Sequence, residues 1–259
     1  MAKPTLFFDN LLADPGATVT ASSTDSGYAV RNLYDWRAYT WWKPTAMPAS
    51  VTIDCGADRQ ADFALIHTHN LGTLMSSDTI TVQVRASSDN FAASDELIAT
   101  LAPQVEGDDA PLLAVFDSPQ IYRYWRIVFV GDVVPSIAIA AIGQAFELPE
   151  WLSQGFDPLG RTLEGQGNTN EKGQPLGRSV QFESWTQPIV LERISSAWLR
   201  SQWMPAWRAR LRGQPFVFGW DYELAPTELI LVTAGERFAS PHYSGGLCDL
   251  SFDLSGVAS

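Results

Sequence analysis

Short runs in which apolar and polar residues alternate are the feature of this sequence that most restricts its fold. In residues 79–85 (TITVQVR), Ile80, Val82 and Val84 alternate with polar residues, as in a strand with one buried face and one face in water. Similar runs, rich in β-branched and aromatic residues and bounded by turn formers, occupy residues 50–54, 63–67 and 124–130. Residues 247–254 (LCDLSFDL) alternate in the same way. The pattern predicts a mainly β chain whose first half is a β-sandwich.

The composition changes near Pro149, which indicates more than one domain. Residues 153–178 hold six glycines and two prolines, as in a long loop or an extended arm. Residues 1–150 carry 8 Lys and Arg against 18 Asp and Glu, whereas residues 151–259 carry 9 against 11. We therefore expect a sandwich over 1–150, an extended loop or arm over 151–178, and a β domain with one helix over 179–259. A loop of that length is unusual inside a compact domain, so we hypothesise that a neighbouring subunit orders the arm.

The second domain contains one segment with a helical pattern, residues 188–212. Leu191, Ile194, Ala197 and Trp198 would form its apolar face, and Pro205 is expected to end or kink it. Four arginines in or near the second half of this segment form a positive patch, for which we predict a contact in an assembly; they are Arg200, Arg208, Arg210 and Arg212. The alternative is that these side chains line a solvated helix face.

Several functions are disfavoured by composition. The net charge of −12 argues against nucleic acid as a partner. No apolar run approaches about 18 residues, so no membrane insertion is expected, and the start lacks the pattern of a signal peptide. Cys55 and Cys248 are far apart in sequence and are predicted to be buried thiols in a chain made in a reducing cytosol. No motif for nucleophilic, acid–base or phosphate chemistry is present, and His67 and His69 lack a third metal ligand nearby, so we expect neither an enzyme nor a metal site.

The first half resembles the galactose-binding-like, or discoidin-like, domains. Six short motifs occur in the order and spacing of that family over roughly residues 10–150; they are Ala21-Ser22-Ser23, Asn32-Leu33-Tyr34-Asp35, Thr40-Trp41-Trp42, Val51–Gly56, Tyr122–Ile127 and Ile142–Leu148. The resemblance implies a jelly-roll sandwich. It also implies a structural calcium near Asp35, Thr40 and Glu147. We favour the alternative, in which Asp35 and Thr40 close a tight loop by hydrogen bonds.

The last third of the chain resembles the β domain of distal or minor tail proteins of long-tailed phages, which have a β-barrel-like fold with one helix. The matching segments are Ile189–Arg212, Gly213–Phe218 and Tyr243–Leu247. Together the two resemblances imply a structural virion protein of a tail tip or baseplate, assembled in the host cytoplasm. Its partners would be other tail proteins and copies of itself in a ring around the tail axis.

An aromatic cluster near the start of the chain suggests a binding surface. Alternation predicts that Trp42 points into the core and Trp41 outward. A surface made of aromatic rings and nearby polar groups could bind a host-surface glycan or contact another subunit; its residues would be Trp36, Tyr39, Trp41, His69 and Asn70. The alternatives to the tail-tip function are therefore a carbohydrate-binding adhesin and an accessory carbohydrate-binding module of a polysaccharide-active protein.

Overall fold

The computed structural model describes residues 2–75, 80–103, 107–153 and 155–257. The chain is mainly β, and its contacts divide it into two compact units. The first, which we call the sandwich unit, comprises Phe7–Phe146 and Ala225–Glu228. The second, the helix unit, comprises Met1–Leu6, Glu147–Leu224 and Leu229–Ser259. The sequence did not predict that the first six residues group with the second half of the chain.

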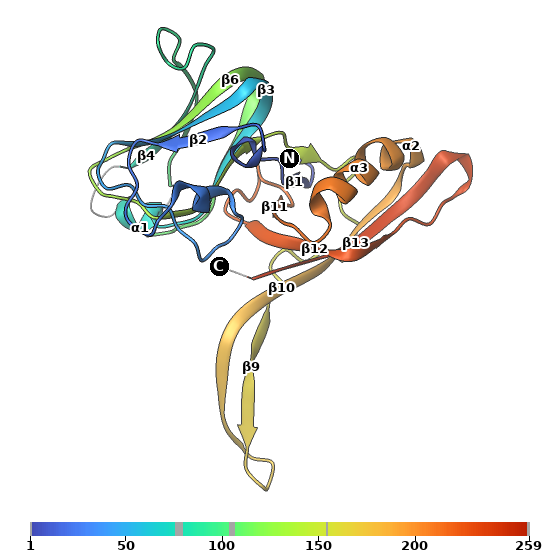
Figure 1. Ribbon diagram of the computed structural model, residues 1–259. Helices are drawn as coiled ribbons and strands as arrows, with labels where there is room; N and C mark the ends of the chain where they lie inside the picture. Colours follow the sequence, from blue (N-terminus) through green and yellow to red (C-terminus); the bar gives the residue numbers. More distant parts are fainter. Residues whose placement is uncertain (1, 76–79, 104–106, 154, 258–259) are drawn as a thin grey trace. The chain divides into compact units, whose positions relative to one another are not determined.

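The strands of the sandwich unit form one sheet with the order β2-β3-β6-β4-β5, and β7 also pairs with β3. Their bounds are β2 (Thr18–Ala21), β3 (Ala49–His69), β4 (Thr81–Ser87), β5 (Glu96–Leu101), β6 (Leu112–Val130) and β7 (Ile137–Gly143), with the short helix α1 at Leu71–Met75. The first part of β3 pairs with β2 and the end of β6, whereas its last part pairs with β7 and the start of β6. The two long strands β3 and β6 therefore pair with each other along most of their length, and their two halves have different neighbours on the other side (Figure 1).

The core of the sandwich unit follows the alternation in the sequence. Ile80, Val82 and Val84 are buried, and the polar residues between them are partly exposed. Trp42 is fully buried, as predicted, and its ring lies 5.4 Å from that of Phe129. The two strands predicted at 50–54 and 63–67 are parts of the single strand β3. The register of β3 against β6 shifts between Asp54 and Arg59, and the strand continues through this shift without a turn.

The helix unit is built on a second sheet, with strand order β8-β1-β11-β12-β13-β10-β9. Its strands are β1 (Thr5–Phe7), β8 (Phe146–Glu147), β9 (Thr162–Thr169), β10 (Pro175–Ser195), β11 (Pro215–Gly219), β12 (Leu229–Ala239) and β13 (Leu247–Val257). In β13, Cys248, Leu250, Phe252 and Leu254 are buried and the residues between them are exposed or partly exposed, which confirms the predicted alternation.

The helical segment is shorter than predicted. Residues 188–195 belong to β10, and the helical turns run from Ser196 to Leu211 without ending at Pro205. They comprise α2 (Ser196–Trp198), a π-helical turn at Leu199–Trp203, α3 (Met204–Ala206) and a second π-helical turn at Trp207–Leu211. The buried apolar side chains are spaced four residues apart, and they are Leu199, Trp203, Trp207 and Leu211. The wide π turns, closed by hydrogen bonds from residue i+5 to residue i, keep this four-residue stripe on one face of the helix.

The segment predicted as a loop or arm contains a β-hairpin. Strand β9 pairs antiparallel with residues 175–184 of β10. Figure 1 shows β9 and this part of β10 as a two-stranded arm that extends away from the rest of the helix unit's sheet. We call residues 162–184 the arm.

Two further predictions concern the whole chain. Cys55 and Cys248 are both buried free thiols, one in each unit, and burial raises the pKa of Cys55 to about 11. In the described ranges, no helix has the length and apolar character needed to cross a membrane.

Candidate functional site

The aromatic cluster predicted from the sequence lies on a loop of the sandwich unit, between Tyr34 and Trp42. Tyr39 is 75% exposed, and Trp36 and Trp41 are partly exposed. Trp36 has a φ of 60°, a left-handed conformation that is costly for a bulky side chain. Such strain is found most often at functional sites, where the surrounding structure holds the residue in place.

The loop is held by hydrogen bonds from its own polar side chains. The Thr40 hydroxyl donates to Asp35 at 3.0 and 2.8 Å, and the Arg37 amide donates to Asp35 Oδ1 at 3.0 Å. Asn32 Nδ2 donates to the Trp41 carbonyl at 2.8 Å. The three rings therefore project from a backbone whose conformation is fixed before any ligand arrives.

His69 and Asn70 are near this loop in the fold, but they are not open to solvent as a binding surface requires. Ile137 pairs with His69 on one side and forms a bridge to Trp42 on the other. His69 is only 4% exposed, and its Nδ1 accepts a hydrogen bond from the Leu71 amide at 3.1 Å. Asn70 is partly buried, and its Oδ1 accepts from the Ser136 amide at 2.8 Å. Both side chains are used to fix the turn after β3, so neither is part of the site we propose.

The residues that the resemblance assigns to calcium do not form a ligand set. Asp35 already accepts bonds from Thr40 and Arg37, which is the loop-closing interpretation of these residues. Glu147 is an exposed residue of β8 and groups with the helix unit. Across the residues that the structure describes, no three or more His, Cys, Asp and Glu side chains are arranged to hold a metal.

The predicted arginine patch lies on the helical segment and just after it. Arg200, Arg208, Arg210 and Arg212 are all exposed, while the Leu and Trp stripe of the same segment is buried. Arg200 Nη1 donates to Ser196 Oγ at 3.3 Å, one turn earlier. These arginines thus have the exposure that a contact with another subunit requires. The same exposure is expected of a solvated helix face.

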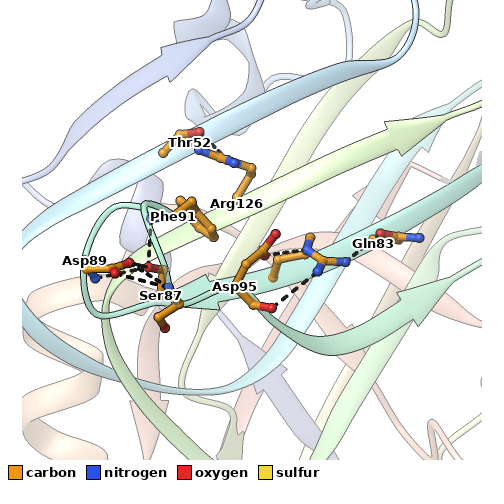
Figure 2. Close-up of polar contacts among 9 residues, drawn as sticks. Thr52, Gln83, Ser87, Asp89, Phe91, Asp95 and Arg126 are labelled. Atoms are coloured by element: carbon orange, nitrogen blue, oxygen red, sulfur yellow. Dashed lines mark hydrogen bonds and ion pairs between the residues drawn. The ribbon is translucent and has the colours of Figure 1, made fainter.

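A polar cluster that the sequence did not predict occupies the outer face of the sandwich sheet (Figure 2). Arg126 of β6 lies directly opposite Thr52 of β3 and Arg85 of β4. Their neighbours along the strands, Ile53, Val84 and Trp125, are buried, so this row of three points away from the core. Directly opposite residues on paired strands have Cβ atoms about 5 Å apart, which brings two positive charges together.

Arg126 is held between a hydroxyl and an aromatic ring. Its Nε donates to Thr52 Oγ1 at 2.9 Å, and its guanidinium carbon lies 3.7 Å from the centre of the Phe91 ring. Burial lowers the pKa of Arg126, the adjacent Arg85 acts in the same direction, and Asp95 opposes them. Arg85 has its own partners, because Nε donates to Asp95 Oδ1 at 2.6 Å and Nη1 to Gln83 Oε1 at 3.0 Å.

The loop between β4 and β5 places Phe91 over Arg126. Asn90 and Phe91 both have left-handed φ angles, 60° and 63°. Asp89 stabilises this turn by accepting bonds from the amides of three following residues, and the Ser87 hydroxyl accepts one from the Phe91 amide at 2.8 Å. The Ser87 hydroxyl and these amides hold the pKa of Asp89 below its usual range, so the carboxylate stays ionised and keeps the turn.

In the part of the chain that the structure describes, the two Nη atoms of Arg126 have no hydrogen-bond partner. They are suited to an acceptor group of a ligand lying beside Phe91. The sequence carried one signal of this cluster, namely two arginines at outward-facing positions of separate strands, but only the register shows that they are opposite each other.

Comparisons with known proteins give structural likenesses without a family. No protein-family model matches the sequence. A search of curated proteins finds no match either. Among solved structures, the chain is similar to CpGH89CBM32-6 from Clostridium perfringens, with 20% identity and a TM-score of 0.42 over 54% of this chain and 100% of that one.

Two further structures show a similar degree of likeness. The family 32 CBM of NanJ from C. perfringens, in complex with galactose, has 18% identity and a TM-score of 0.40 over 55% of this chain and 99% of its own. The CBM32 of AlyQ, in complex with 4,5-unsaturated mannuronic acid, has 22% identity and a TM-score of 0.40 over 52% of this chain and 96% of its own. With identities and scores this low, these likenesses carry no conclusion about what this chain binds.

Proposed function

We propose that the sandwich unit is a non-catalytic glycan-binding module, which contacts carbohydrate through Trp36, Tyr39 and Trp41. One observation carries the proposal: three aromatic rings, all at least partly exposed, project from one loop whose backbone is fixed by Asp35 and Asn32. Sugar rings present apolar C–H faces that stack on such aromatic surfaces, and a fixed loop loses little entropy on binding.

A glycan array probed with the 259-residue chain tests this proposal. We expect binding to a defined set of glycans, weakened roughly tenfold or more by Trp41→Ala and by Tyr39→Ala. Trp151, an aromatic residue of the helix unit that is 41% exposed, provides the matched control, and Trp151→Ala should leave binding unchanged. If the affinity for every bound glycan is unchanged in a Tyr39→Ala/Trp41→Ala variant, the assignment to this loop is contradicted, as it is if no glycan binds to the parent chain.

A second candidate function is assembly with further copies of this chain, and the arm favours it. From residue 162 to 183, the described side chains are exposed except that of Asn170, which is partly buried. Four of them are large apolar groups, Leu163, Leu176, Val180 and Phe182, with exposures between 43 and 69%. A two-stranded hairpin has no core of its own and is marginally stable in water, so apolar groups on it are better explained by a partner that covers them.

The charge distribution points to another copy of the chain as that partner. Arg200, Arg208 and Arg212 are exposed cations in a chain with a net charge of −12, and most of the excess acid lies in residues 1–150. An arginine patch of one copy and an acidic half of the next are complementary. This is the arrangement expected of the virion tail-tip subunit that the sequence resembles, although the structural likenesses give that assignment no support.

Light scattering of the full chain tests assembly. We expect an oligomer that dissociates as salt is raised, because exposed charge pairs are screened within about 10 Å at 0.1 M salt. Arg208→Glu/Arg210→Glu should dissociate it at low salt, whereas Arg237→Glu, an exposed change outside the patch, should not. A chain that is monomeric at all concentrations, or an oligomer indifferent to both salt and charge reversal, would rule out this second function.

A further inference from the structure

The helix unit contains an open cavity that neither proposed function uses. Its volume is about 440 Å³, and it is lined by Glu192, Arg193, Tyr243, Leu247 and Asp249. These residues come from β10, from β13 and from the loop that precedes β13. The volume is within the range typical of sites for small ligands.

A β-bulge directs two charged side chains to this cavity. The register of β10 against β13 shifts between Leu191 and Ile194, so Glu192 and Arg193 have no partner residues on β13. Arg193 has a φ of 55°, and its amide donates to Asp249 Oδ1 at 2.9 Å. Bulges of this kind re-aim side chains and are frequent beside functional sites. A glycine would adopt this φ without strain, so the backbone alone does not require an arginine at this position.

Tyr243 forms the aromatic wall of the cavity and is fixed at both ends. Its amide donates to the Leu247 carbonyl at 2.8 Å across a turn in which Gly245 and Gly246 have left-handed φ angles. Its hydroxyl donates to Asp249 Oδ2. The ring is nevertheless 53% exposed, and Leu247 beside it is 38% exposed.

The charges of the cavity are held in defined states. The hydrogen bond to Asp249 raises the pKa of Tyr243, and the same bond, with that from the Arg193 amide, lowers the pKa of Asp249. Asp249 therefore stays ionised, and its two oxygens accept hydrogen bonds from the Arg193 amide and the Tyr243 hydroxyl. By contrast, within the described ranges the side chains of Arg193 and Glu192 make no hydrogen bond or ion pair.

These features fit a sugar ring. A guanidinium only donates and a carboxylate only accepts, whereas each hydroxyl of a sugar does both, so Arg193 and Glu192 together satisfy neighbouring hydroxyls. The ring of Tyr243 and the side chain of Leu247 offer an apolar surface to the C–H face of the same sugar. We propose that this cavity is a saccharide-binding site, in which a sugar ring stacks on Tyr243 and its hydroxyls bond to Arg193 and Glu192.

This site is independent of the aromatic loop and does not rest on the function proposed for it. The two sites are separable by experiment because they share no residue.

The test uses saturation-transfer-difference NMR on the full chain, with galactose, mannose, glucose, N-acetylglucosamine and lactose as probes. The background is Tyr39→Ala/Trp41→Ala, so that the aromatic loop does not contribute. We expect at least one probe to bind in this background, and Tyr243→Ala or Arg193→Gly to weaken it roughly tenfold or more. Tyr243→Phe retains the ring and should bind within a few-fold of the background.

Arg193→Gly is the decisive variant, because glycine accommodates the left-handed backbone and folding should be unaffected. Loss of binding in Arg193→Gly with an unchanged circular dichroism spectrum supports the site. The proposal is overturned if none of the probes binds. It is also overturned if Tyr243→Ala and Arg193→Gly each bind the probe as tightly as the Tyr39→Ala/Trp41→Ala background does. Binding lost only when the aromatic loop is altered would also overturn it.

Discussion

At the scale of single residues, the burial of His69 gives the chain a dependence on pH. Burial lowers the pKa of His69 below its usual value of 6.5, and Asp109 nearby opposes this only in part. As the pH falls below 6.5, the unfolded chain therefore takes up a proton that the folded chain does not. We expect the free energy of unfolding contributed by neutral His69 to be fully present above that pH and to decrease below it.

The variant His69→Asn isolates this effect. Asparagine can accept the Leu71 amide bond that His69 Nδ1 accepts at 3.1 Å, and it does not titrate. Urea unfolding between about pH 7.5 and 5.5 should show a smaller loss of stability in this variant than in the parent. His242→Asn, at an exposed histidine, is the control and should keep the parent's slope. An equal slope in His69→Asn would show that His69 is not responsible.

Single-residue predictions from the sequence succeeded where alternation alone decides the outcome. Trp42 is buried and Trp41 is partly exposed because they are neighbours on an extended segment. His69 could not be predicted to be buried, because its environment is made by β7, which comes from a distant part of the sequence. The contact between Phe91 and Arg126 depends likewise on the turn held by Asp89.

At the scale of elements, the arm should be the first place where the chain is cut. The sequence has three lysines, and Lys3 and Lys43 both precede proline, a bond that lysine-specific proteases cut poorly. Lys172 lies in the turn at the tip of the arm and is exposed. Because a two-stranded hairpin opens easily, we expect a lysine-specific protease to cut rapidly after Lys172 in dilute protein, giving fragments 1–172 and 173–259.

The same cut reports on assembly. If further copies cover the arm, cleavage at Lys172 should slow as protein concentration rises, and Arg208→Glu/Arg210→Glu should restore the fast rate. A Lys172→Gln chain, which should resist the protease, shows that the cut is at this residue. Resistance of the parent in dilute solution, where it is monomeric, would mean that the arm is ordered by its own chain.

The helical segment shows why the bounds and buried face of an element are harder to predict than the alternation of residues along a strand. Leu191 and Ile194 fit a helical period with Ala197 and Trp198, yet they are buried residues of β10 next to a bulge. The true stripe has a period of four, which is longer than the 3.6 residues of an α-helix and requires π-helical turns. A search restricted to the α-helical period therefore selects the wrong face.

At the scale of the whole molecule, the contacts group the chain into two units, each made of segments that are discontinuous in sequence. One boundary between the units falls between Phe146 and Glu147, close to the change in composition near Pro149. The sequence could not show that Met1–Leu6 groups with the helix unit, because β1 pairs with β11, which is more than two hundred residues away in sequence. A strand of three residues carries little pattern of its own.

Each unit has its own aromatic core, so we expect thermal unfolding to show two transitions. Trp42 is fully buried in the sandwich unit, and Trp203 is fully buried in the helix unit, 4.7 Å from the ring of Phe252. Removing either ring leaves a large cavity and should cost about 3–5 kcal/mol in its own unit. Differential scanning calorimetry should therefore find that Trp42→Ala lowers one transition and Trp203→Ala the other, whereas Trp41→Ala lowers neither appreciably. A single transition lowered by both core variants would instead show that the two units unfold as one cooperative body.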